Sequence, residues 1–150
     1  PLSSGDFITR NLFISTGYKV AQKTLSHING FYGVNTASAK VTAILEDLIN
    51  LEAKYVSFST NDDIVSIKQA AAKRICLVGN LNGVKMVNWS EAEIVSNVKT
   101  VIKHAGRDGG LMLAESHGEI PWQVSEKVLL GISAAVEEFG RYPLTWCNDE

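Results

Sequence analysis

A short apolar run followed by an amphipathic helix recurs along this sequence, and this repetition limits the fold more than any other feature. From residue 38 onward, helical and apolar strand-like segments alternate with short connections between them. Neighbouring parallel strands need a crossover between them, and a helix is the usual crossover. The pattern therefore predicts an α/β fold built of βα units with parallel strands.

The last three βα units are clearly marked in the sequence. The apolar runs predict strands at 54–59, 75–79 and 110–115, and the three- and four-residue apolar spacing predicts helices at 38–51, 63–74, 90–106 and 123–139. Ser90-Glu91-Ala92-Glu93 has the form of a capping box, which begins a helix. Gly106 and Gly140 stand where two of these helices are expected to end, because glycine tolerates the left-handed conformation of a helix cap.

The first 37 residues are less regular. We expect a helix after Asp6 and a strand at 24–28 that ends at the turn signal Asn29-Gly30. The chain would then be a single domain over 1–150, with residues 145–150 as a tail and four parallel strands in sequence order, each followed by a helix. Four such units are half of a (β/α)8 TIM barrel, which usually has about 250 residues.

Composition excludes several classes of protein. Apolar residues make up 45% of the chain and charged residues 20%, with three prolines, which is typical of a folded globular domain. The net charge is −2 and charges do not form runs, so neither a nucleic acid nor an anionic membrane is expected as a partner. No apolar run reaches the roughly 20 residues of a membrane span.

The expected compartment is the cytoplasm. The N-terminus has no secretory pattern, and the two cysteines, Cys76 and Cys147, do not indicate an oxidising environment. The chain begins at Pro1 without an initiator methionine, which indicates processing or a piece of a longer polypeptide.

Polar residues that follow the predicted strands are the first place to look for a site, because parallel α/β folds bind ligands at the carboxyl ends of their strands. In chain order these residues are His27, Asn29, Ser59, Asn61, Asp62, Asn80, Asn82, Glu115, Ser116, His117 and Glu119. Several also have a purely structural interpretation. Asp62 can cap the following helix, the asparagines near residue 80 can form turns, and His27 can be a hydrogen-bonded loop residue.

The segment Glu115–Glu119 is the strongest cluster. Two carboxylates within two residues of an imidazole can carry out acid–base chemistry, so Glu115, His117 and Glu119 are the predicted catalytic residues. The predicted substrate-binding residues are Asn29, Asn61, Asp62, Asn80 and Ser116. Phosphate-loop, dinucleotide-binding and nucleophile-elbow motifs are absent from the sequence.

Five short segments together resemble one family. They are Val78-Gly79-Asn80-Leu81, the capped helix from Ser90, Asp108-Gly109-Gly110, His117-Gly118-Glu119-Ile120-Pro121 and Phe139-Gly140-Arg141-Tyr142. In order and spacing, over about residues 40–144, they resemble the C-terminal half of the uroporphyrinogen decarboxylase superfamily. The resemblance implies half of a barrel. The superfamily includes porphyrinogen decarboxylases and zinc-dependent methyltransferases that work with corrinoid proteins and thiols.

The resemblance implies two different sites. The decarboxylases have Gly-His-Gly after the last strand, and Ser116-His117-Gly118 is similar. The methyltransferases bind zinc through His-x-Cys-Gly and a later cysteine. His27-Ile28-Asn29-Gly30 looks like the first of these motifs with asparagine in place of cysteine, and His117 stands where the later cysteine would be. With no thiolate present, zinc would need the nitrogen and oxygen donors of His27, His117 and Glu115, the last replaceable by Glu119.

Three hypotheses of function follow. The leading one is the C-terminal portion of a metal-assisted methyltransferase that takes its methyl group from, or gives it to, a corrinoid carried by a partner protein. The second is the corresponding part of a decarboxylase-like lyase, in which His117 hydrogen-bonds substrate carboxylates without a metal. The third is a non-catalytic half-barrel that binds a small molecule or another chain. The resemblance also implies that the decarboxylases' catalytic aspartate and arginines lie in the other half of the barrel, so this chain alone is not expected to be competent.

Four strands curved for a barrel would leave two open sheet edges and an uncovered inner face. We expect that face to include residues from Val56, Phe58, Leu77 and Leu113. Open edges and apolar patches promote association. A homo-oligomer, most simply a two-fold pair, is therefore the expected state. The alternative is a flattened sheet whose two faces are both covered by the chain's own helices.

Overall fold

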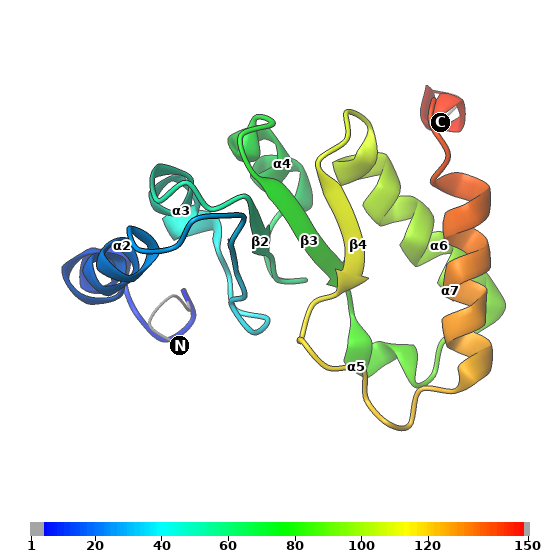
Figure 1. Ribbon diagram of the computed structural model, residues 1–150. Coiled ribbons are helices and arrows are strands. Elements are labelled where there is room, and N and C mark those ends of the chain that lie inside the picture. The colour runs from blue at the N-terminus through cyan, green and yellow to red at the C-terminus, as the bar shows by residue number, and fades with distance from the viewer. Residues whose placement is uncertain (1–4, 149–150) are drawn as a thin grey trace.

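The fold is built on one sheet whose four strands lie side by side in chain order. The computed structural model describes residues 5–148. Its strands are β1 (Gly33–Val34), β2 (Tyr55–Ser57), β3 (Cys76–Leu81) and β4 (Leu111–Glu115). Every neighbouring pair is parallel, in the order β1-β2-β3-β4 (Figure 1). The predicted fold class, parallel βα units that match half of a barrel, is confirmed.

Helical segments connect the strands and flank the sheet (Figure 1). They are α1 (Arg10–Phe13), a π-helical turn (Ile14–Tyr18), α2 (Lys19–Leu25), a 3-10 turn (Thr42–Ile44), α3 (Leu45–Asn50), α4 (Ile64–Ala71), α5 (Gly83–Met86), α6 (Glu91–Val101), a second π-helical turn (Ile102–Gly106), α7 (Glu126–Phe139) and a final 3-10 turn (Thr145–Asn148). None of the helices within residues 5–148 combines the length and apolar character that a bilayer crossing requires.

The first strand is not where the sequence predicted it. Residues 19–25 form α2, and the first strand follows eight residues after that helix ends, at Gly33–Val34. The prediction of a strand at 24–28 is therefore wrong. The physical reason is a helical apolar spacing, because Phe13, Gly17, Ala21 and Leu25 all line one face and continue the helix through residue 25.

The helix predicted at 38–51 begins later than expected. Ala37 and Ser38 have positive φ angles of 49° and 65°, which a helix does not contain. The backbone N–H groups of Val41 and Thr42 donate to the Asp62 carboxylate, at 3.1 and 3.1 Å for the nearest oxygens. Helical structure therefore starts at Thr42. Similarly, α7 starts at Glu126 rather than near 123, and the short helix α5 was not predicted.

Side-chain caps begin α4 and α6 at the predicted places. Asp63 accepts a hydrogen bond from the Ser66 N–H at 2.6 Å, which caps α4. The capping box of α6 is complete: the Ser90 hydroxyl accepts from the Glu93 N–H at 3.3 Å, and the Glu93 carboxylate accepts from the Ser90 N–H at 2.8 Å. These caps satisfy N–H groups that have no partner inside the helix.

The apolar core lies between the sheet and its helices. One cluster joins β2 and β3 to the N-terminal helices and α4, and a second joins β3 and β4 to α6 and α7. Val56, Phe58 and Leu77 are fully buried in the first cluster, and Leu113 packs against the second. The prediction that some of these four side chains face away from the helices is therefore wrong.

The opposite sheet face carries the alternate residues of the strands. Tyr55 pairs with Cys76 and Val78 pairs with Met112 in the sheet register. Tyr55 is 41% exposed and Met112 is 45% exposed. Because successive side chains of a strand point to opposite faces, this set marks the face turned away from the core.

Candidate functional site

The carboxyl end of the sheet gathers polar side chains from the ends of β2 and β3 and from the loops after β1 and β4. These loops come together at the lower edge of the sheet in Figure 1. We call this region the carboxyl mouth and define it by five residues: Asn35, Ser57, Asn80, Ser116 and His117. Asn80 pairs with Ala114 near the ends of β3 and β4, so these two strands end level with each other.

The loop after β4 is held by its own carboxylate. Glu115 accepts the His117 N–H at 2.6 Å and also the Gly118 N–H. The Glu115 side chain is only 9% exposed, and Gly83 packs so closely that a Cβ there would lie 2.9 Å from a carboxylate oxygen. Glu115 therefore shapes this loop, which is a structural role for a residue predicted to be catalytic.

The His117 ring is oriented from one side. Its Nδ1 lies 3.2 Å from the Ser116 hydroxyl and 3.6 Å from the Glu115 carboxylate. The side chain is 33% exposed, and Nε2 makes no hydrogen bond within residues 5–148. The arrangement fixes the imidazole through Nδ1 and leaves Nε2 available for a ligand.

The loop after β1 approaches the loop after β4. Gly118 has a φ of 92°, which an L side chain rarely adopts, and a Cβ at that position would lie 3.7 Å from the Asn35 Nδ2. Asn35 follows β1 directly, whereas Gly118 follows β4. The two outer strands of the sheet therefore send polar groups to one place.

Asn35 and Thr36 are the residues that sequence reasoning missed. The Asn35 Oδ1 accepts from the Ala37 N–H at 2.8 Å and from the Ser57 hydroxyl at 3.2 Å, and the Thr36 N–H donates to the same hydroxyl at 2.8 Å. Because β1 is only two residues long and includes Gly33, it lacks a recognisable apolar run. The signal that could have found these residues is the polar pair directly after Tyr-Gly-Val.

Asp62, a predicted substrate-binding residue, is used inside the fold. It is 7% exposed, and its carboxylate accepts hydrogen bonds from the N–H groups of Val41, Thr42 and Ser59 and from the Thr42 hydroxyl. It thereby joins the start of the helical segment at Thr42 to the end of β2. This is the structural role that the sequence left open.

The remaining predicted residues differ in position. Asn80 lies in the mouth, where its Nδ2 donates to the Ser59 carbonyl at 3.1 Å. Asn82 caps α5 by accepting the Lys85 N–H at 3.0 Å. Asn61 and Glu119 are exposed, and neither side chain makes a hydrogen bond in the described part of the chain.

His27 and Asn29 lie at the other end of the sheet. Both precede β1, and the Tyr32 carbonyl just ahead of this strand accepts from the Lys54 N–H just ahead of β2. Asn29 lines a hollow of about 460 Å³ at this amino end. The expectation that these two residues follow the first strand is therefore wrong.

The zinc ligands proposed from the sequence do not fit a metal ion. His27 precedes the first strand and His117 follows the last, so a parallel sheet places them at opposite ends. Among residues 5–148, no group of three His, Cys, Asp or Glu side chains is placed to hold a metal. The structure does not bring His27, His117 and Glu115 together.

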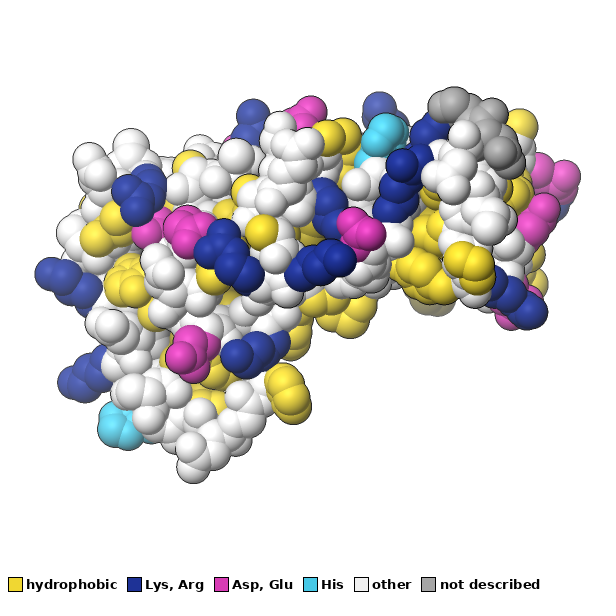
Figure 2. Space-filling model, turned by 90° about the horizontal axis from the view of Figure 1, so that it is seen from above, with side chains coloured by type: hydrophobic (Ala, Val, Ile, Leu, Met, Phe, Trp, Pro, Cys, Tyr) yellow, Lys and Arg dark blue, Asp and Glu magenta, His cyan; other side chains and the backbone are white. Residues whose placement is uncertain are grey.

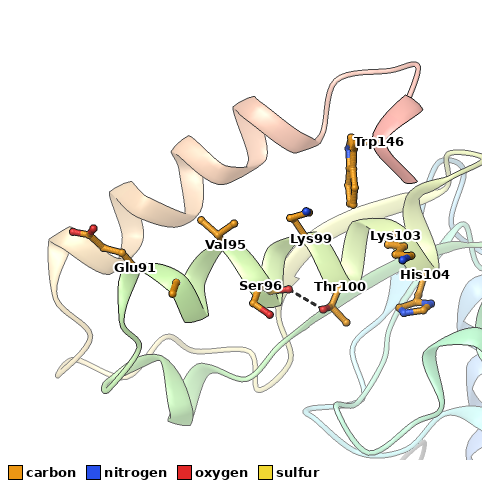
Figure 3. Close-up of a pocket in the computed structure, with 9 residues that line it drawn as sticks. Glu91, Val95, Ser96, Lys99, Thr100, Lys103, His104 and Trp146 are labelled. Atoms are coloured by element: carbon orange, nitrogen blue, oxygen red, sulfur yellow. Dashed lines mark hydrogen bonds between the residues drawn. The ribbon is translucent and has the colours of Figure 1, made fainter. Parts of the chain in front are cut away.

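A larger hollow, of about 670 Å³, runs along the outer surface of α6 (Figure 3). The Lys99 ammonium lies 5.0 Å from the centre of the Trp146 ring and 5.2 Å from that of Phe139. These cation–π contacts join α6, α7 and the final turn. The hollow contains none of the residues of the carboxyl mouth.

The amino end of the sheet has a mixed surface. Basic and acidic side chains are scattered over this face instead of being sorted by sign (Figure 2). Lys68 is partly buried there, which lowers the pKa of its ammonium group, and it donates to the Gly109 carbonyl. This hydrogen bond joins α4 to the turn before β4 at the amino end of the sheet.

Comparison with known proteins agrees with the fold and with the resemblance seen in the sequence. A family model described as uroporphyrinogen decarboxylase (URO-D) matches residues 3–139. A comparison with curated proteins found no match. The family model covers nearly the whole chain, including all four strands and the loop that carries His117. The chain therefore belongs to the uroporphyrinogen decarboxylase family.

Proposed function

We propose that this chain forms the carboxylate-binding wall of a decarboxylase-like lyase that acts on a porphyrinogen. The observation that carries the proposal is the loop after β4. It fixes the His117 imidazole through Nδ1 and leaves Nε2 open at the carboxyl mouth. An imidazole N–H is a good donor to a carboxylate, and a charge-assisted hydrogen bond is stronger than a neutral one.

The other groups of the mouth are consistent with an anionic ligand. The Asn35 Nδ2 can donate a hydrogen bond, whereas the Ser57 hydroxyl already donates to the Asn35 Oδ1. The buried Ser116 hydroxyl lies against the His117 Nδ1, and the Glu115 carboxylate accepts hydrogen bonds from its own loop. Neutral donors recognise a carboxylate without requiring a metal. In this proposal His117 contacts the substrate, and Glu115 and the buried Ser116 position His117.

The alternative function is a corrinoid-linked methyltransferase. It depends on zinc ligands contributed by His27 and His117, which lie at opposite ends of the sheet. No contact among the described residues favours that function over the lyase. It is therefore the second candidate, and metal binding distinguishes it from the first.

Binding of uroporphyrin, the oxidised and fluorescent form of uroporphyrinogen, tests the proposal. We expect the chain to bind it and His117→Ala to weaken binding about tenfold, because a hydrogen bond to a charged group is lost. His104→Ala is the matched control, since His104 lies in the π-helical turn Ile102–Gly106 and lines the outer hollow. Fluorescence titration measures all three affinities.

Two results would contradict this function. Equal affinity of the wild-type and His117→Ala proteins would remove the role of His117. Stoichiometric zinc in protein purified without chelators, lost on His117→Ala, would instead favour the methyltransferase.

A further inference from the structure

We infer that Asn35 is a substrate-binding residue of the carboxyl mouth and that its Nδ2 amide donates a hydrogen bond to the same carboxylate-bearing ligand as His117. The inference rests on the proposed function and adds a residue from the opposite edge strand of the sheet. No motif in the sequence pointed to this position.

The two ends of the Asn35 amide have different surroundings. The oxygen accepts two hydrogen bonds, from the Ala37 N–H at 2.8 Å and the Ser57 hydroxyl at 3.2 Å. These contacts fix the orientation of the amide, because an oxygen accepts and an NH2 group cannot. Within residues 5–148, Nδ2 donates no hydrogen bond. The local fold therefore uses one end of this side chain and leaves the donor end unused.

The unused donor points toward the loop that carries His117. Nδ2 lies 3.7 Å from where a Cβ of Gly118 would stand, and Gly118 directly follows His117. Since Gly118 has no side chain, nothing on that residue covers the amide. A ligand at the mouth can meet donors from both sides, with Asn35 on the β1 side and His117 on the β4 side.

This geometry also indicates the kind of ligand. The Asn35 Nδ2 is a donor, and the His117 Nε2 is also a donor when the Ser116 hydroxyl donates to Nδ1, so together they fit an acceptor such as a carboxylate. They come from loops after the first and last strands, with β2 and β3 between them.

Asn35→Asp separates the binding role from the structural one. An aspartate keeps the oxygen that accepts from Ala37 and Ser57, and it replaces only the donor with a second, negatively charged oxygen. Asn88→Asp is the matched control. Asn88 is an exposed residue after α5, and its substitution introduces the same charge on the carboxyl side of the sheet. Thermal melting of each variant checks that the fold is kept.

The experiment compares uroporphyrin binding by these proteins at a fixed salt concentration. We expect Asn35→Asp to lower affinity about tenfold or more, from the lost hydrogen bond and the added repulsion, and Asn88→Asp to stay within about twofold of wild type. If Asn35→Asp does not fold, Asn35→Ser, which removes the amide without adding charge, is expected to lower affinity severalfold.

The outcomes separate this inference from the proposed function. Wild-type binding with unchanged affinity in a folded Asn35 variant would overturn the inference and leave the role of His117 standing. An equal loss of affinity in Asn35→Asp and Asn88→Asp would also overturn it, since general repulsion would then explain the effect. Absence of wild-type binding would overturn the proposed function and the inference together.

Discussion

Single carboxylates do much of the structural work near the carboxyl mouth. Asp62 lies in the loop after β2 and Glu115 is the last residue of β4, and both accept hydrogen bonds from backbone N–H groups of nearby loops. The sequence identified both as functional candidates because of their position. It could not show that their oxygens are used by the chain itself, since the donors at Val41 and Thr42 are about 20 residues away from Asp62 in sequence.

We predict that Asp62→Asn destabilises the protein by about 1–3 kcal/mol. The amide would turn one acceptor into a donor and leave buried N–H groups without partners. Urea unfolding followed by circular dichroism measures the change. The control is Asp63→Asn, because asparagine caps a helix as well as aspartate does. Similar destabilisation in both variants would show that the hydrogen bonds of Asp62 have no special role.

At the scale of helices and strands, local chemistry predicted some elements well and others badly. The capping box at Ser90 and the cap at Asp63 were readable because a few neighbouring residues determine them. The first strand was not readable, since it has two residues and is stabilised by pairing with β2. Because the first strand was expected too early in the sequence, the residues predicted to follow it were His27 and Asn29, whereas Asn35 and Thr36 follow it in the structure.

We predict that Ser90→Ala lowers the free energy of unfolding by about 1 kcal/mol at neutral pH, because the α6 cap is lost. Ser96→Ala on the exposed face of the same helix is the control, since the Ser96 hydroxyl caps nothing. Denaturant titration of the two variants gives the difference. A loss no larger in Ser90→Ala than in Ser96→Ala would contradict the prediction.

The same box predicts a dependence on pH. The N–H and hydroxyl of Ser90 lower the pKa of the Glu93 carboxyl below its usual range. A carboxyl with a lowered pKa in the folded state stabilises the protein above its unfolded pKa of about 4.3, and this contribution is lost as the pH falls through the folded value. The difference in the free energy of unfolding between wild type and Ser90→Ala should therefore become smaller below about pH 4. A difference that stays constant down to pH 3 would contradict this prediction.

At the scale of the molecule, the sheet has one covered face and one uncovered face. The order β1-β2-β3-β4 and the repeated helix crossovers were predictable because the βα pattern repeats along the chain. Which side chains face inward was not, since short apolar strands covered by helices do not alternate clearly in sequence. The side chains of Tyr55, Val78 and Met112 lie on the uncovered face of the sheet, whereas the sequence had led us to expect Val56 and Leu77 there.

We predict that the chain self-associates. Within residues 5–148, β1 and β4 each pair with one neighbour only. An apolar hollow of about 310 Å³ adjoins β1, and α7 exposes Leu130 (62%) at the other side of the sheet. Two copies related by a two-fold axis could place α7 of each beside the hollow of the other, which would bury both surfaces. Light scattering over a dilution series measures the mass.

Leu130→Glu tests the surface that this association would use. We expect it to shift the mass toward the monomer, because a buried charge opposes the contact. Val65→Glu is the control, since Val65 is an exposed apolar residue of α4, in the middle of the chain of βα units. A monomeric wild-type protein at micromolar concentration would contradict the prediction.

The hydrogen bonds that the Glu115 carboxylate accepts from its own loop have a consequence for the energetics of recognition. They fix the position of His117 before any ligand binds. The conformational entropy of this loop is therefore lost on folding, and ligand binding does not have to order the loop again. Association at the mouth then resembles docking onto a rigid template. A ligand should bind in a single kinetic step, and the loop should give the same hydrogen-exchange protection with and without it.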